Sequence, residues 1–92
     1  MKYLDVSERL AVERIAKAVE AFTLSAEVPK DAATQMKGEA KAVRLWAEVR
    51  QYGRAVAVAK GLLDTVVREG QPDAMAAAEV IENAIKTLER SA

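Results

Sequence analysis

The pattern of apolar residues is most regular in the middle of the chain, where such residues recur at alternating spacings of three and four. The positions concerned are Ala42, Leu45, Val49, Tyr52, Val56, Ala59, Leu63 and Val66. This is the heptad spacing with which one helix packs against another. Because the pattern passes Gly53 without a change of phase, it predicts one continuous helix over residues 29–69.

The composition of this middle stretch favours the same prediction. Between Gln35 and Asp64 the chain has no Ser, Thr, Asn, Asp or Pro, the residues that most often cap helices and form turns. Gly53 remains as a candidate for a break, and a glycine inside a helix costs about 1 kcal/mol relative to alanine. The alternative interpretation is therefore a turn near Gly53, which would give a monomeric four-helix bundle.

A shorter helix is predicted on each side of the long one. The first runs to about Ala26, and its apolar stripe consists of Val12, Ile15, Val19, Phe22 and Ala26. Pro29 suits the first turn of the long helix, and Gly70 with Pro72 marks its end. The last helix runs to about Arg90, and its stripe consists of Met75, Ala78, Ile81, Ile85 and Leu88.

These elements predict an all-α protein with a single domain over residues 1–92, in which two shorter antiparallel helices flank a long central helix. That layer leaves the central seam uncovered, so we predict a homodimer in which two long helices cross about a two-fold axis near Gly53. Gly53 at the crossing would then permit close backbone approach. Gly38 and Gly61 on the long helix are also expected to mark close helix contacts. The predicted dimer seam consists of Leu45, Val49, Tyr52, Val56 and Leu63. The alternative is a compact monomer whose seam meets the first and last helices.

The composition narrows the chemistry that the chain can perform. It has no Cys and no His, so disulfides, thiolate metal sites and histidine-based catalysis are not expected. The formal net charge of zero argues against a dedicated nucleic-acid-binding protein. No apolar run approaches the roughly 20 residues of a membrane span. We therefore expect a cytoplasmic protein without metal or cofactor.

Basic residues near the middle of the chain form the candidate binding site. Arg50 and Arg54 are one helical turn apart and continue the apolar stripe that ends at Ala47, with Arg44 and Lys60 nearby in the sequence. Two neighbouring guanidinium groups can hold a carboxylate or phosphate by bidentate hydrogen bonds. The alternative is that these cations pair with glutamates of neighbouring helices or face water.

The most consistent functional interpretation is a small non-enzymatic protein that acts through protein–protein interaction, as a regulator, adaptor or inhibitor. It rests on the missing catalytic residue types and on surplus apolar positions of the first helix, Val6, Leu10 and Leu24. The alternative is a small helical enzyme, or a binder of an anionic metabolite, that uses the central arginine pair.

Overall fold

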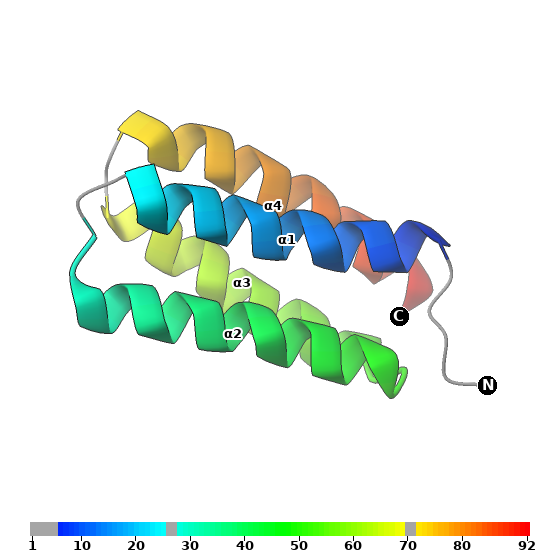
Figure 1. The fold of residues 1–92 in the computed structure, drawn as a ribbon. Helices are drawn as coiled ribbons and strands as arrows, with labels where there is room; N and C mark the ends of the chain where they lie inside the picture. Colours follow the sequence, from blue (N-terminus) through cyan, green and yellow to red (C-terminus); the bar gives the residue numbers. More distant parts are fainter. Residues whose placement is uncertain (1–5, 26–27, 70–71) are drawn as a thin grey trace.

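The computed structural model describes residues 6–25, 28–69 and 72–92, and within these ranges it contains four helices and no strand. They are α1 (Val6–Ser25), α2 (Lys30–Glu48), α3 (Tyr52–Glu69) and α4 (Pro72–Ser91). The helices alternate in direction and form an elongated bundle (Figure 1). Each helix packs on the helices before and after it, and α4 also packs on α1. Consequently α2 and α4 lie diagonally opposite, and none of their described residues come within 8 Å of each other between Cα atoms.

The prediction of one long helix over residues 29–69 is wrong, because the chain reverses direction between α2 and α3. At this turn Arg50 has a φ of 63°, in the left-handed region that few residues other than glycine adopt. The Arg50 amide donates to the Ala47 carbonyl at 2.9 Å, and the Gln51 amide donates to the Trp46 carbonyl at 2.9 Å. This pair of hydrogen bonds is the Schellman motif, which satisfies carbonyls at the end of α2.

The physical reason for the turn lies in the apolar stripes on either side of it. In one straight helix, the stripe of α2 and the stripe of α3 would cover different parts of a long surface. After the turn both face a single core, which the first and last helices complete. The alternative of a turn near Gly53 gives the observed number of helices, although Gly53 itself lies inside the first turn of α3.

The core confirms several predicted stripes and corrects others. Val12, Ile15, Val19 and Phe22 of α1 are buried, as are Ile81, Ile85 and Leu88 of α4. In contrast, Met75 was expected in the core and is 78% exposed. Within the bundle, Gly38, Gly53 and Gly61 do not mark close helix contacts, because a Cβ atom added at any of them would meet nothing within 4 Å.

The first and last helices are joined at one end of the bundle by a buried polar contact. Glu8 in the first turn of α1 is only 6% exposed, and its Oε2 accepts a 2.5 Å hydrogen bond from the Ser91 hydroxyl at the end of α4. The bundle is thus closed by contacts between elements that are far apart in the sequence.

Two residues that belong to the predicted helix boundaries, Ala26 and Gly70, lie outside the described residues.

Candidate functional site

A groove runs between α1 and α2, the neighbouring pair of helices with the least extensive contact. It encloses about 880 Å³ and has an apolar floor that includes Val12, Ala16, Val19 and Ala40. Ala16 of α1 and Ala40 of α2 both line this groove, and both have small side chains. We refer to this feature as the α1–α2 groove.

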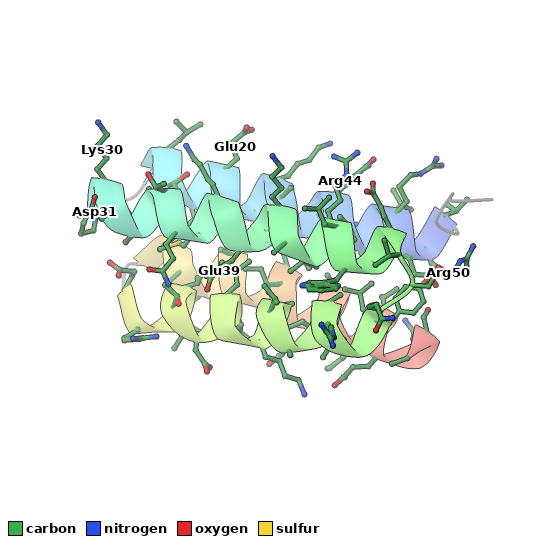
Figure 2. All side chains as sticks on the ribbon, turned by 90° about the horizontal axis from the view of Figure 1, so that it is seen from below. Glu20, Lys30, Asp31, Glu39, Arg44 and Arg50 are labelled. Carbon is green, nitrogen blue, oxygen red and sulfur yellow. The ribbon has the colours of Figure 1, made fainter. Side chains whose placement is uncertain are left out.

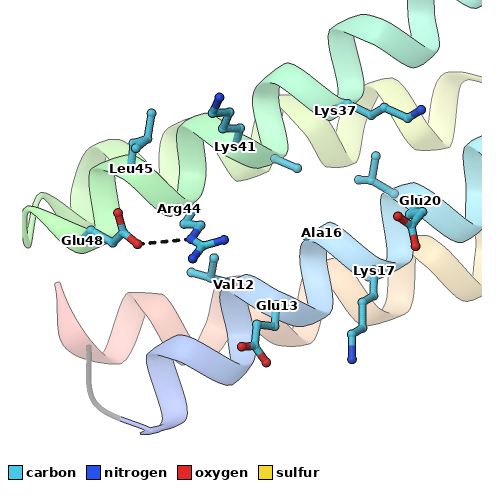
Figure 3. A pocket seen from close by; sticks show the side chains of 12 residues that line it. Val12, Glu13, Ala16, Lys17, Glu20, Lys37, Lys41, Arg44, Leu45 and Glu48 are labelled. Carbon is cyan, nitrogen blue, oxygen red and sulfur yellow. Dashed lines mark hydrogen bonds and ion pairs between the residues drawn. The ribbon is translucent and has the colours of Figure 1, made fainter. Parts of the chain in front are cut away.

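The two edges of the α1–α2 groove differ in charge. The α2 edge carries Lys37, Lys41 and Arg44, whereas Glu13, Lys17 and Glu20 alternate in sign along the α1 edge. Arg44 is engaged by Glu48 of the same helix, with 3.2 Å between Nε and Oε2 (Figure 3). Lys37 and Lys41, in contrast, form no ion pair with any described residue. The α2 edge therefore presents two exposed ammonium groups.

An exposed apolar side chain continues this α2 edge beyond the lysines. Leu45 lines the groove and is 53% exposed. It follows Lys37 and Lys41 at a spacing of four, so the three side chains lie along one face of α2. The α1–α2 groove is therefore apolar on its floor and at Leu45, and basic along most of its α2 edge.

A second groove lies between α3 and α4 and encloses about 950 Å³. Its apolar lining includes Leu63, Val67 and Met75, of which Met75 is the most exposed. Its charged residues are mainly acidic and comprise Asp64, Glu79 and Glu82, with Arg68 as the one cation. The two grooves thus lie on opposite sides of the bundle and differ in the sign of their charge.

The four basic residues of the sequence-predicted site are placed in three different regions. Arg44 lies in the α1–α2 groove, whereas Lys60 pairs with Glu89 of α4 at 3.2 Å. Arg50 and Arg54 both line a shallow hollow of about 410 Å³ at the end of the bundle. They belong to the turn and to α3, so they do not share one face of a continuous helix, contrary to the prediction.

The Arg54 guanidinium already has a partner. It stacks over the ring of Trp46, with 4.9 Å between its central carbon and the ring centroid, which is a favourable cation–π distance. Arg50 sits at the outer end of the α2–α3 turn (Figure 2) and also has an interaction of its own. A clamp on an anion would require both guanidinium groups to leave or share these contacts.

Buried carboxylates occur at two separate places. One oxygen each of Glu8 and Glu39 is buried without a hydrogen-bond partner among the described residues. Glu8 lies at the start of α1. Glu39 lies halfway along α2, and its side chain is located between α2 and α3 (Figure 2). Neither residue lines one of the grooves described above. Within residues 6–25, 28–69 and 72–92, no group of three acidic side chains could hold a metal ion.

The predicted dimer seam is divided by the turn. Leu45 of α2 and Val49 just after it are exposed, Val56 of α3 is buried, and Tyr52 and Leu63 are partly buried. The seam therefore cannot serve as one continuous surface. None of the helices in the described part of the chain is both long and apolar enough to cross a membrane.

The sequence prediction missed the two lysines of the α1–α2 groove and the glutamates of the α3–α4 groove. A signal for the lysines was present, because Lys37, Lys41 and Leu45 repeat at a helical spacing. The prediction of one continuous helix assigns Leu45 to the dimer seam. It therefore does not connect Leu45 with the two lysines that precede it on the same face of α2.

Comparisons with known proteins add no relative. No protein-family model matches the chain, and neither a curated protein nor a solved structure was found to match it. Functional inference therefore rests on the grooves and on the residues that line them.

Proposed function

We propose that this chain is a non-enzymatic protein–protein interaction module, and that it binds an amphipathic helix with an acidic edge in the α1–α2 groove. The observation that supports the proposal most directly is the combination of exposed Leu45 with the unpaired Lys37 and Lys41 along one edge of an apolar groove. Helix-in-groove recognition uses such a surface, with apolar anchors on the helix and complementary charges at the rim.

The length of the groove suits a short helical segment of a partner. Its α2 side extends from Lys37 to Glu48, which is roughly 17 Å at 1.5 Å per residue and matches about three helical turns. Apolar side chains of the partner would cover the floor around Ala16 and Ala40, and its carboxylates would approach the lysines. The burial of Leu45 would supply apolar free energy at about 25 cal/mol per Å², while the charges would set orientation and specificity.

The test uses two designed helical peptides of about 18 residues. Both carry the same leucine stripe, and they differ only in whether the residues along one edge are Glu or Lys. Titration into isotope-labelled protein should shift the amide signals of α1 and α2 residues that line the groove, and only the Glu-edged peptide should do so. Equal binding of both peptides, or binding of neither, would contradict the proposal.

A matched pair of variants sharpens this test. Leu45→Asp introduces a charge at the groove and should weaken peptide binding about tenfold or more, which corresponds to roughly 1.4 kcal/mol. Leu24→Asp makes the same change at a leucine that is 79% exposed and outside the groove. It should leave the affinity unchanged, so equal effects of the two substitutions would argue against the groove.

The anionic-metabolite alternative has weaker support. Arg50 and Arg54 share the hollow at the end of the bundle, but Arg54 already stacks on Trp46 and Arg50 has a contact of its own. Titration of the protein with inorganic phosphate should therefore produce no saturable shift of the amide signals of residues 50–54.

A further inference from the structure

The α1–α2 groove is complementary to a surface on the opposite side of the same molecule. We propose that α4 of a second copy of this chain docks in the α1–α2 groove, so that copies associate head to tail. This inference rests on the proposed function, because it identifies the acidic helix that the groove receives. The relevant surface of α4 is formed by the exposed side chains Met75, Glu79 and Glu82, which we refer to as the α4 ridge.

The first argument is charge. The α4 ridge carries two carboxylates, and neither Glu79 nor Glu82 forms an ion pair with a described residue. The α1–α2 groove carries Lys37 and Lys41, which are likewise unpaired. The α4 ridge and the α2 edge of the groove therefore present two exposed charges each, and their signs are opposite, whereas the charges of the α1 edge alternate in sign.

The second argument is spacing. On the α4 ridge the methionine is followed by glutamates four and seven residues later; on α2, Leu45 is preceded by lysines four and eight residues earlier. At 1.5 Å per residue, both series place their charges about 6 Å and about 10–12 Å from the apolar residue. An antiparallel alignment of the two helices therefore sets Met75 beside Leu45 and each glutamate beside a lysine.

The third argument is the exposure of the two apolar residues. Met75 is 78% exposed and Leu45 is 53% exposed, so each leaves apolar surface in water that the contact would bury. Methionine has a flexible side chain that adapts to irregular apolar surfaces. Val12 and Leu45 both line the α1–α2 groove, and Leu45 is the one that leaves apolar surface in water for such a side chain to cover.

The geometry of the bundle requires that the ridge comes from another molecule. Residues of the α4 ridge line the α3–α4 groove, on the side opposite to α1 and α2. A copy that offers its groove to one neighbour still presents its own ridge to another. Such a heterologous contact does not close at two copies, so it produces species larger than a dimer as concentration rises.

The test is a charge exchange followed by sedimentation equilibrium. One variant is Lys37→Glu/Lys41→Glu and the other is Glu79→Lys/Glu82→Lys, with all four substitutions at exposed positions. The unmodified protein should show a mass that rises with concentration, and each variant alone should self-associate about tenfold or more weakly. An equimolar mixture of the two variants should associate again, because every groove then meets a ridge of opposite charge.

Controls separate this contact from other kinds of association. Arg9→Glu/Arg14→Glu makes the same change in net charge at exposed α1 residues outside the groove, and it should leave the association unchanged. The association should weaken when ionic strength rises from about 0.1 M to about 1 M, because the Debye length falls from about 10 Å to about 3 Å.

Each outcome supports or overturns the inference. Loss in both variants with recovery in the mixture supports it, and loss in both variants without recovery in the mixture overturns it. An unmodified protein that stays monomeric, or an association that Glu79→Lys/Glu82→Lys does not weaken, overturns it. If the Glu-edged peptide still binds a protein that stays monomeric, the groove receives another protein and only the head-to-tail contact fails. If neither peptide binding nor self-association occurs, the proposed function fails as well.

Discussion

The central apolar seam differs in burial on the two sides of the α2–α3 turn. Leu45 of α2 and Val49, which directly follows α2, are exposed to solvent, whereas Val56 and Ala59 of α3 are buried in the core. The sequence pattern is the same on both sides of the turn, so periodicity alone does not determine which positions become core. Which apolar positions are buried depends on the side of the helix on which neighbouring helices pack. The turn at Arg50 changes that side between α2 and α3.

This comparison suggests different roles for the two halves. Truncation of a buried side chain leaves a cavity and removes apolar contacts, whereas truncation of an exposed side chain changes stability little. The α3 half should therefore determine the free energy of unfolding. The α2 half, which borders the α1–α2 groove, should determine binding.

The largest expected effect compares two valines of the seam. Val56→Ala removes two methyl groups from a site that is 8% exposed and should lower the free energy of unfolding by about 2 kcal/mol. Val49→Ala makes the same change at a site that is 61% exposed and should alter it by less than about 0.5 kcal/mol. Urea denaturation of both variants measures the difference, and equal losses would contradict the assignment of the two halves.

A smaller effect is expected from Gly61, which lies inside α3 but outside its buried stripe. A Cβ atom added there meets nothing within 4 Å, so Gly61→Ala should gain helix propensity without a steric penalty. The expected rise in the free energy of unfolding is about 1 kcal/mol, measured by thermal or urea denaturation. A loss of stability would indicate that a neighbouring helix packs against this position after all.

The turn that separates the halves can be strengthened. Arg50→Gly relieves the left-handed backbone conformation of a residue with a side chain, which costs about 1–2 kcal/mol, and loses part of that gain to unfolded-state entropy. We expect a net gain in the free energy of unfolding of about 0.5–1 kcal/mol. Arg50→Ala is the matched control, because it removes the same side-chain contact without removing the strain. If the alanine variant were as stable as the glycine variant, backbone strain at Arg50 would be excluded.

The smallest effect is expected for the contact that links the two halves across the turn. Arg54→Ala removes the cation above Trp46 and should cost about 0.5 kcal/mol, the value typical of exposed cation–π pairs. Trp46 is the single tryptophan of the chain, so its emission spectrum reports the change directly. Arg54→Lys should have an intermediate effect, and an unchanged spectrum in both variants would argue against the stacking.

The sequence predicted helix positions better than it predicted their connection. The start of α2 after Pro29 and the buried stripes of α1 follow from spacing and from known helix signals. The α2–α3 turn does not, because its left-handed position holds Arg50 where glycine is usual and the heptad pattern continues across it. The Schellman hydrogen bonds that stabilise this turn are backbone interactions, and side-chain periodicity gives no indication of them.

Less of the candidate site could be predicted than of the helices. Arg44 and Leu45 were named from the sequence for reasons other than the groove in which they lie. Lys37 and Lys41 become significant only because α1 packs beside α2, and Met75 was placed in the core on spacing alone. A groove is a property of two helices, so its lining cannot be identified until their pairing is known.

The hydrogen bond between Glu8 and Ser91 has a consequence for the order of the helices along the chain. It shows that the start of α1 and the end of α4 are in contact. Each helix therefore packs against two others, and the four helices form a closed ring. A linker that joins these two ends, combined with a new opening between α1 and α2, would keep every interhelical contact. Circular permutation is tolerated where chain ends are close, and the permuted chain should fold to the same bundle.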